Sequence, residues 1–224
     1  MKKSLHSLII AAVVSFAAVC ANAAETVSEA VVLKVTGNAQ ATLPGQSRAA
    51  IQVGDKLPQG TVIETPDNSA VDIQAFSGNT TTIQPGSKVE LNKLSLTTDG
   101  GQITKQTAEI GLSLGTVVAS LDPSKKGIND YSIRTPKGVA AARGTSYTVN
   151  VTASGEVTLF VATGVVTLVN ESGQSVTLQP GQSVKLTPAG TFSGIINERA
   201  TTAITTNPGA SESNINITIV SPSS

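Results

Sequence analysis

The chain has almost none of the residues on which most enzyme active sites are built. Its 224 residues include one cysteine, one histidine, one methionine and no tryptophan, and the first three are Cys20, His6 and Met1. The sequence after position 23 therefore offers no imidazole and no thiolate. This excludes Ser–His and Cys–His catalysis, and also zinc, copper and haem sites that use those ligands. We predict that the protein is not an enzyme and holds no cofactor or metal.

Charge is scarce and balanced. The chain carries 15 basic and 15 acidic residues, and charged residues are 13% of the total, about half of the ~25% typical of globular proteins. Removal of residues 1–23, which include Lys2 and Lys3, leaves 13 basic and 15 acidic residues and a net charge of −2. This balance provides no basic surface for nucleic acid or anionic lipid, so we expect neither as a partner.

Residues 1–23 have the pattern of a secretory signal peptide. A basic start is followed by the apolar run 8–19 and by small residues at the −3 and −1 positions of a cleavage site after Ala23. The run is shorter than the ~20 residues of a membrane span. An uncleaved anchor and a lipoprotein that begins at Cys20 are the alternatives. We expect a bacterial periplasmic or secreted protein without a stable membrane span after cleavage.

Apolar and polar residues alternate through most of the chain. Threonine and valine, with 28 and 24 copies, supply the two faces of these segments, because both are β-branched and suit a pleated strand. Period-two segments include 71–75, 147–151 and 157–161, and Gly, Pro, Asn or Asp turns separate them. We predict an all-β fold, either a single β-sandwich or roll or a short β-solenoid. The one helical turn that we expect is at 105–110.

A fifteen-residue pattern occurs twice. Residues 77–91 read SGNTTTIQPGSKVEL and residues 172–186 read SGQSVTLQPGQSVKL, with eight identical positions at an offset of 95. Each copy predicts a turn, a strand, a Pro-Gly turn and a second strand, which we interpret as a repeated hairpin. Residues 42–47 are a shorter version. The repetition favours stacked β units in which each copy covers the face of its neighbour.

The character of the chain changes after Pro188. We assign residues 24–188 to the β domain and residues 189–224 to a flexible tail, because the tail is rich in Ser and Thr and lacks a sustained period. Its segment Ile215–Ile219 alternates cleanly. We predict for this segment either a late strand of the domain or a strand that pairs with the edge of a partner.

One motif suggests catalysis. Residues 111–115 match the G-x-S-x-G nucleophile elbow, in which a Ser on a strand-to-helix turn is activated by a His. The chain has no His after position 23 and no helix pattern follows the motif, so we interpret the match as coincidental. Ser87 and Lys88 do not form a Ser–Lys pair either, because adjacent strand residues point to opposite faces.

Residues 131–149 are the most distinctive segment. Pro136 ends one strand, since proline is disfavoured inside a sheet, and residues 138–142 are small and apolar for a loop. Because arginine is rarely buried without a partner, we expect Arg143 to tether this loop to the sheet. The alternative is that both arginines of the segment form a binding edge. The candidate interaction residues are Arg134, Thr135, Pro136, Arg143, Gly144, Thr145 and Tyr147.

The same residues carry a resemblance to a known family. Residues 133–136 and 141–149 resemble the V-x-T-P and A-x-R-G-T-x-[FY]-x-V stretches of the FecR-domain family, named for the periplasmic part of the iron(III)-dicitrate sensor. A Gly-Asp-x-Leu element at 54–57 and a Pro-Gly-Ser element at 85–87 precede them in the family's order. The resemblance spans residues 30–188.

The resemblance implies an all-β, extracytoplasmic, non-catalytic domain. In the sensors this domain relays a signal from an outer-membrane receptor to a cytoplasmic anti-sigma segment. We expect no cytoplasmic domain and no membrane span here, so we carry over the type of domain and not iron-dicitrate signalling. We expect a stand-alone exported protein-interaction or scaffold module of the cell envelope, linked to signalling. The alternative is a carbohydrate- or cell-surface-binding module, with a cell-wall polymer as partner, although few aromatic residues are present for such a site.

Overall fold

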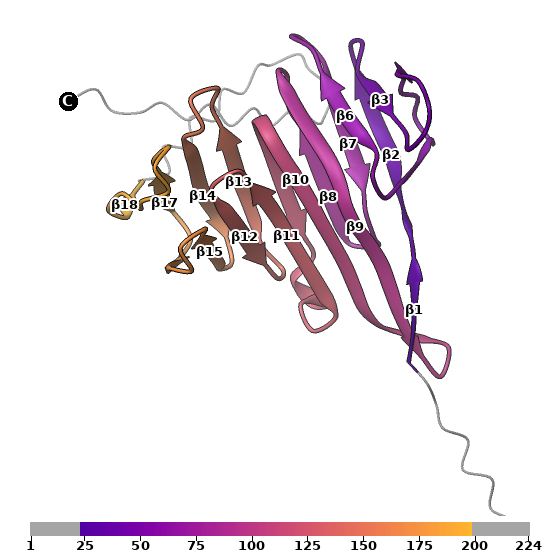
Figure 1. Cartoon of the computed structure of the whole chain (residues 1–224). Helices are drawn as coiled ribbons and strands as arrows, with labels where there is room; N and C mark the ends of the chain where they lie inside the picture. Colours follow the sequence, from indigo (N-terminus) through magenta and orange to yellow (C-terminus); the bar gives the residue numbers. More distant parts are fainter. Residues whose placement is uncertain (1–22, 199–224) are drawn as a thin grey trace, which may run out of the picture.

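The computed structural model describes residues 23–198, which form two β-sheets stacked face to face (Figure 1). In spatial order, sheet A contains β4 (Ala49–Ala50), β3 (Gln40–Thr42), β6 (Val62–Thr65), β9 (Ser87–Asp99), β10 (Gln102–Leu121), β11 (Asn129–Thr135), β12 (Gly138–Ala142), β15 (Val166–Asn170) and β16 (Ser175–Leu178). The short strand β1 (Ala24–Val27) pairs with the far end of β9.

Sheet B forms the second layer. In spatial order it contains β5 (Lys56–Pro58), β2 (Glu29–Thr36), β7 (Ala70–Gln74), β8 (Asn79–Ile83), the second part of β10, β13 (Ser146–Val151), β14 (Val157–Thr163), β17 (Gln182–Leu186) and β18 (Ile196–Asn197). Neighbours are antiparallel except β10 and β11. The expected all-β fold of many short strands is thus confirmed.

Strand β10 belongs to both sheets. Its residues up to Leu114 pair with β9 in sheet A, and its residues from Gly115 onward pair with β13 in sheet B. At the crossing Gly115 has a φ of +89°, and a Cβ there would lie 2.5 Å from Cα of Ser87. No other residue fits this conformation and this contact. The G-x-S-x-G match at 111–115 is therefore part of a strand that changes sheets, and it does not form a nucleophile elbow.

Two local expectations are wrong. Residues 105–110, where we expected a helical turn, lie within β10, because Ala108 and Ile110 face the core and Thr107 and Glu109 do not. Residues 138–142, expected as a loop, form β12, whose Gly138, Ala140 and Ala142 are buried at alternate positions. The regular secondary structure outside the strands of the described chain is the 3-10 turn η1 (Pro123–Lys125).

The Pro-Gly turns of the two long repeats are not hairpins, because each connects a strand of one sheet to a strand of the other sheet. We call such a connection an arch. The first connects β8 in sheet B to β9 in sheet A, and the second connects β16 in sheet A to β17 in sheet B. In both arches the glycine N–H donates to the neighbouring unit, from Gly86 to Thr65 O at 2.7 Å and from Gly181 to Val161 O at 2.8 Å. The shorter repeat at 42–47 does connect a hairpin, between β3 and β4.

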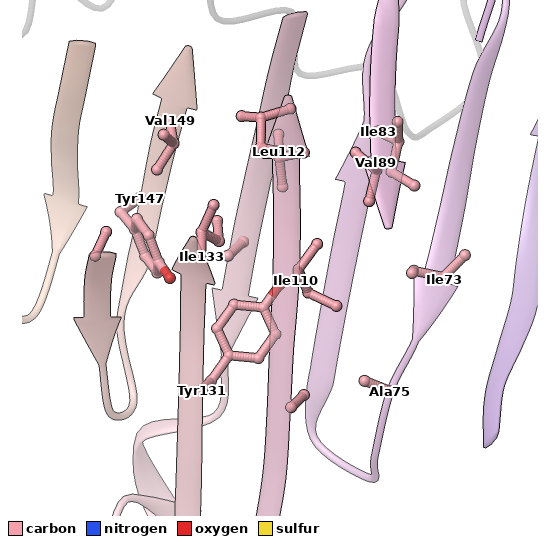
Figure 2. Close-up of a cluster of buried hydrophobic side chains, with 14 of the residues drawn as sticks. Ile73, Ala75, Ile83, Val89, Ile110, Leu112, Tyr131, Ile133, Tyr147 and Val149 are labelled. Atoms are coloured by element: carbon pink, nitrogen blue, oxygen red, sulfur yellow. The ribbon is translucent and has the colours of Figure 1, made fainter. Parts of the chain in front are cut away.

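The core fills the space between the sheets (Figure 2). Ile73, Ile83 and Val149 come from sheet B, and Ile110 and Ile133 come from sheet A. All are at most 1% exposed, and burial of each such side chain contributes roughly 1.5–3 kcal/mol. A hydrogen bond of 2.7 Å between Thr81 Oγ1 in β8 and Tyr131 OH in β11 crosses the interior from one sheet to the other.

Strand pairing is also present after residue 188. Phe192 bridges to Leu186, and β18 pairs with β17 at the edge of sheet B. The expected signal peptide and the segment Ile215–Ile219 lie almost wholly or wholly outside the described residues. Within residues 23–198, no helix is long and apolar enough to cross a bilayer.

Candidate interaction surface

The structure separates the two arginines of the distinctive segment. Arg134 is near the end of β11, where it pairs with Val139 on β12, and Arg143 follows β12 at its other end. Four residues of extended chain separate Val139 from Arg143, which corresponds to about 13 Å. The two arginines therefore lie at opposite ends of the β11–β12 hairpin.

Arg134 makes a bidentate ion pair on the outer face of sheet A. Its Nε donates to Glu109 Oε1 at 2.7 Å and its Nη2 to Oε2 at 3.1 Å, while Asn92 Nδ2 donates to the same carboxylate at 3.2 Å. The hydrogen bond from Arg134 lowers the pKa of Glu109, and the same bond raises the pKa of Arg134. Arg134, and not Arg143 as expected, therefore connects its strand to the sheet.

Thr135 and Pro136 form the tight turn between β11 and β12. The Thr135 hydroxyl donates to Gly138 O at 2.9 Å and accepts from Gly138 N at 3.1 Å. Pro136 has no N–H to donate and its fixed φ suits the first central position of a turn. These two residues have a structural role in closing the hairpin.

Residues Arg143, Gly144 and Thr145 form an arch that carries the chain from sheet A to sheet B. Gly144 has a φ of +65°, and a Cβ there would lie 2.6 Å from Cα of Pro123. Thr145 is 1% exposed, its hydroxyl donates to Val165 O at 3.3 Å, and its carbonyl accepts from Leu121 N at 2.9 Å. The Gly-Thr part of the signature is explained by this close packing, which fixes the position of Arg143.

Four connections pack together at this end of the sandwich. We call it the arch end and define it as residues 77–78, 122–126, 143–145 and 164–165. Asp122 N donates to Gly78 O at 2.7 Å, and a Cβ on Gly164 would lie 3.1 Å from Cα of Thr145. Val165 is 44% exposed there. The arch end is a rigid surface built from short, mutually bonded connections.

The arch end has three cations and one acid. Arg143 and Lys126 are exposed, and neither forms a salt bridge or side-chain hydrogen bond with any residue in 23–198. Lys125 Nζ donates to the hydroxyl of Ser77 at 2.7 Å. The one carboxylate, Asp122, accepts from Ser124 N at 2.8 Å, and hydrogen bonds from Ser124 lower its pKa. No periodic signal in the sequence joins Lys126 or Val165 to Arg143, because only the arches bring them together.

Tyr147 is part of the core and is not available to a partner. It is fully buried, and its hydroxyl has no hydrogen-bond partner in the described structure. Tyr131 is 1% exposed and packs edge-on against Phe76, with ring centroids 6.3 Å apart. Burial raises the pKa of both tyrosines. Within residues 23–198 no three His, Cys, Asp or Glu side chains form a group that could hold a metal.

Comparisons with known proteins find one matching family and a similar fold. Residues 61–167, which include all seven candidate residues, match a family model described as FecR protein. Two crystal structures of a candidate anti-sigma factor from Parabacteroides distasonis ATCC 8503 are similar in fold at 15% identity, with TM-scores of 0.50 and 0.48. Each match covers 62% of this chain and 60% of that chain, so the likeness extends over less than two thirds of the neighbour.

No curated protein matches the chain. The family match starts in the segment before β6 and ends in β15, so it includes the sheet-crossing strand β10 and the Arg-Gly-Thr arch. The resemblance predicted from the sequence is confirmed, because residues 61–167 match the family model described as FecR protein.

Proposed function

We propose that the protein is a non-catalytic interaction module of the bacterial cell envelope that binds a protein partner through the arch end and takes part in signalling. The observation that carries this proposal is the exposed Arg143 guanidinium, which has no ion-pair partner among the described residues although the backbone beneath it is rigidly packed. A long side chain on a fixed backbone loses less freedom on binding than one on a mobile loop. Arginine is also among the residues enriched at the centres of protein interfaces.

Most cations outside the arch end, although not Lys34 and Lys56, are in salt bridges. Arg48, Lys88, Lys93, Lys105 and Arg134 are all in salt bridges on sheet A or beside it. Exposed pairs of this kind contribute little to binding specificity, since their charges already compensate one another. The arch end differs because three cations stand against one carboxylate that is already hydrogen-bonded.

The family supports the regulatory part of the proposal. FecR domains are regulatory and non-enzymatic, and the structural neighbours are described as anti-sigma factors. Location in the envelope rests on the expected signal peptide at residues 1–23. N-terminal sequencing of the protein recovered from periplasm or culture medium tests this point, and we expect the mature chain to begin at Ala24.

A carbohydrate-binding site is less well supported, because the aromatic side chains that could contact a sugar are buried or half-buried. Tyr131 and Tyr147 are buried, and Phe76 is 6% exposed. Phe160 and Phe192 are half-buried and lie on different parts of the fold. A sugar site usually presents an exposed aromatic face, and these five positions provide none that is fully open.

Affinity capture from the native envelope tests the proposal. The wild-type protein and the Arg143→Ala, Lys126→Ala and Lys88→Ala variants are immobilised at equal amounts, and the retained proteins are identified. We expect one protein to be retained by the wild type and by Lys88→Ala, and to be reduced at least fivefold by Arg143→Ala, because a truncated interface hot spot costs about 1 kcal/mol or more. Equal retention by all four proteins contradicts an interface at the arch end.

A further inference from the structure

Apart from the arch end, the fold has two ends at which its outermost strands lie, and these two ends differ in how they are covered. At the end formed by β16 to β18, the loop 187–194 folds over the core: Asn170 Nδ2 donates to Gly190 O at 2.9 Å, and Phe192 packs against the core cluster. At the opposite end, formed by β3 to β5, Ala49 and Ala50 are exposed and Val53 is 65% exposed. Stacked β units need a polar cap at each end. At this second end the loop 51–55 buries Ile51 but leaves Ala49, Ala50 and Val53 uncovered among the described residues, and we call it the uncapped end.

The uncapped end contains a hollow of about 230 Å³. Its apolar lining consists of Ala41, Leu43, Ala49, Ala50, Ile51 and Leu57, with Asp55 and Lys56 beside them. A cavity of about 150 Å³ accepts a benzene molecule, so this hollow has room for a branched aliphatic side chain. Next to it, β4 pairs with β3 alone among the described strands, so its other edge has unpaired backbone groups.

One segment of the chain matches what the hollow requires. Residues 215–219 read INITI, so three isoleucines recur at every second position and would point to one face of a strand. The segment has no charged residue that would have to be desolvated. Elsewhere between residues 199 and 214, Thr, Ala, Ser and Asn predominate and no such alternation occurs.

The chain between β18 and residue 215 is also long enough to reach the hollow. Sheet B has nine strands from β5 to β18, and eight steps of ~4.8 Å give a width of about 38 Å. The seventeen residues from Glu198 to Ile215 can span about 55 Å when extended. The chain beyond β18 can therefore return to the hollow of the same molecule.

We propose that residues 215–219 cover the uncapped end of their own chain by placing isoleucine side chains in the hollow and by pairing with the free edge of β4. Apolar burial and backbone hydrogen bonding act together in this arrangement, as in other cases of strand addition. It would protect a strand edge that could otherwise pair with another molecule. This inference concerns a surface at the other end of the sandwich from β16 to β18 and is independent of the partner proposed for the arch end.

Disulfide trapping tests the proposal, because Cys20 is the one native cysteine. The full chain is exported with Cys20→Ala and with the pair Ala50→Cys and Ile217→Cys, then oxidised mildly and mapped by mass spectrometry. The control pair is Thr177→Cys, on the exposed edge strand β16, with Ile217→Cys. We expect an intramolecular disulfide in the first pair, formed at least about tenfold faster than in the control, because docking raises the effective concentration of the thiols.

A second variant separates docking from chance encounters. Adding Ile215→Asp and Ile219→Asp to the first pair should reduce its rate to that of the control, because a carboxylate is expensive to bury in an apolar hollow. Equal rates for the two pairs, or no disulfide in either, overturn the proposal. Disulfide-linked dimers without the intramolecular product also overturn it, since they show that a second copy covers the hollow.

Discussion

Arg134 donates two hydrogen bonds to Glu109, from Nε at 2.7 Å and from Nη2 at 3.1 Å. The pair connects β11 to β10 on the outer face of sheet A, in a parallel pairing that places Arg134 beside Gly111. Arg143, nine residues further along the chain, has no such partner within residues 23–198. Two arginines in one signature therefore have different roles, since one stabilises the sheet and the other is available for contact.

Arg134→Ala should lower the free energy of unfolding more than Arg143→Ala. The Arg134 side chain is 53% exposed and that of Glu109 is 26% exposed, so we expect a loss of roughly 0.5–1 kcal/mol, at the upper end for exposed pairs. For Arg143→Ala we expect a change near zero. Urea unfolding of both variants, with Glu109→Gln to complete a double-mutant cycle, measures the difference. A larger loss for Arg143→Ala would show that Arg143, and not Arg134, connects its segment to the sheet.

The unpaired hydroxyl of Tyr147 predicts an unusual response to mutation. Tyr147→Phe removes a buried group without a hydrogen-bond partner, so it should leave stability unchanged or raise it by up to about 1 kcal/mol. Tyr131→Phe removes the bond to Thr81 and should lower stability by roughly 0.5–1.5 kcal/mol. Thermal unfolding of the two variants provides the comparison. If Tyr147→Phe is the more destabilising change, the Tyr147 hydroxyl makes a hydrogen bond in the folded protein, which contradicts this prediction.

Alkaline titration should show both tyrosines as protected. Burial raises the pKa of Tyr131 and of Tyr147 above the ordinary value of 10.0. Because the folded pKa exceeds the unfolded one, the stability from these groups is complete below pH ~10 and is lost as pH rises further. The chain has two tyrosines, so the tyrosinate absorbance reports on this pair alone. We expect it to appear together with unfolding measured by circular dichroism. Tyrosinate formation in the folded protein at pH ~10 would show that the rings are accessible.

Gly115 is the position where a side chain should be least tolerated. Gly115→Ala would place a Cβ 2.5 Å from Cα of Ser87 at a φ of +89°. Gly173→Ala is the matched control, because its φ is +79° but nothing lies within 4 Å. We expect about 1–2 kcal/mol for the conformational strain in the control and at least about 2 kcal/mol more for Gly115→Ala, because backbone atoms must move. Equal losses would show that the crossing of β10 is not tightly packed.

The strands could be predicted where threonine and valine alternate, as in β13 and β14, because period two places one residue type on each face. β12 was missed because its inward residues are Gly138, Ala140 and Ala142, whose small side chains provide little hydropathy contrast. Strand β10 was not predicted, because we expected a helical turn at 105–110 and found no strand signal in the G-x-S-x-G match at 111–115, where Gly115 marks a change of sheet. Pro-Gly looks the same in an arch and in a hairpin, and pairing partners far along the chain decide between them.

The candidate surface could be predicted in part. Arg143, Gly144 and Thr145 stand out in the sequence, and the structure explains the last two by close packing. Lys126 and Val165 were not found, because they are seventeen residues before and twenty-two after Arg143 and converge only through the arches. The partner of Arg134 was missed for the same reason, since Glu109 lies on another strand of sheet A.

Photo-cross-linking at Val165 in living cells tests whether a partner protein binds at the arch end. A photoreactive residue at this 44% exposed position of the arch end leaves Lys125, Lys126 and Arg143 in place, and Val53, 65% exposed at the end formed by β3 to β5, is the control. We predict an adduct of one defined mass from Val165, none of that mass from Val53, and loss of the adduct when Arg143→Glu is added. An adduct that persists with Arg143→Glu, or that forms equally from Val53, would contradict a partner bound at the arch end.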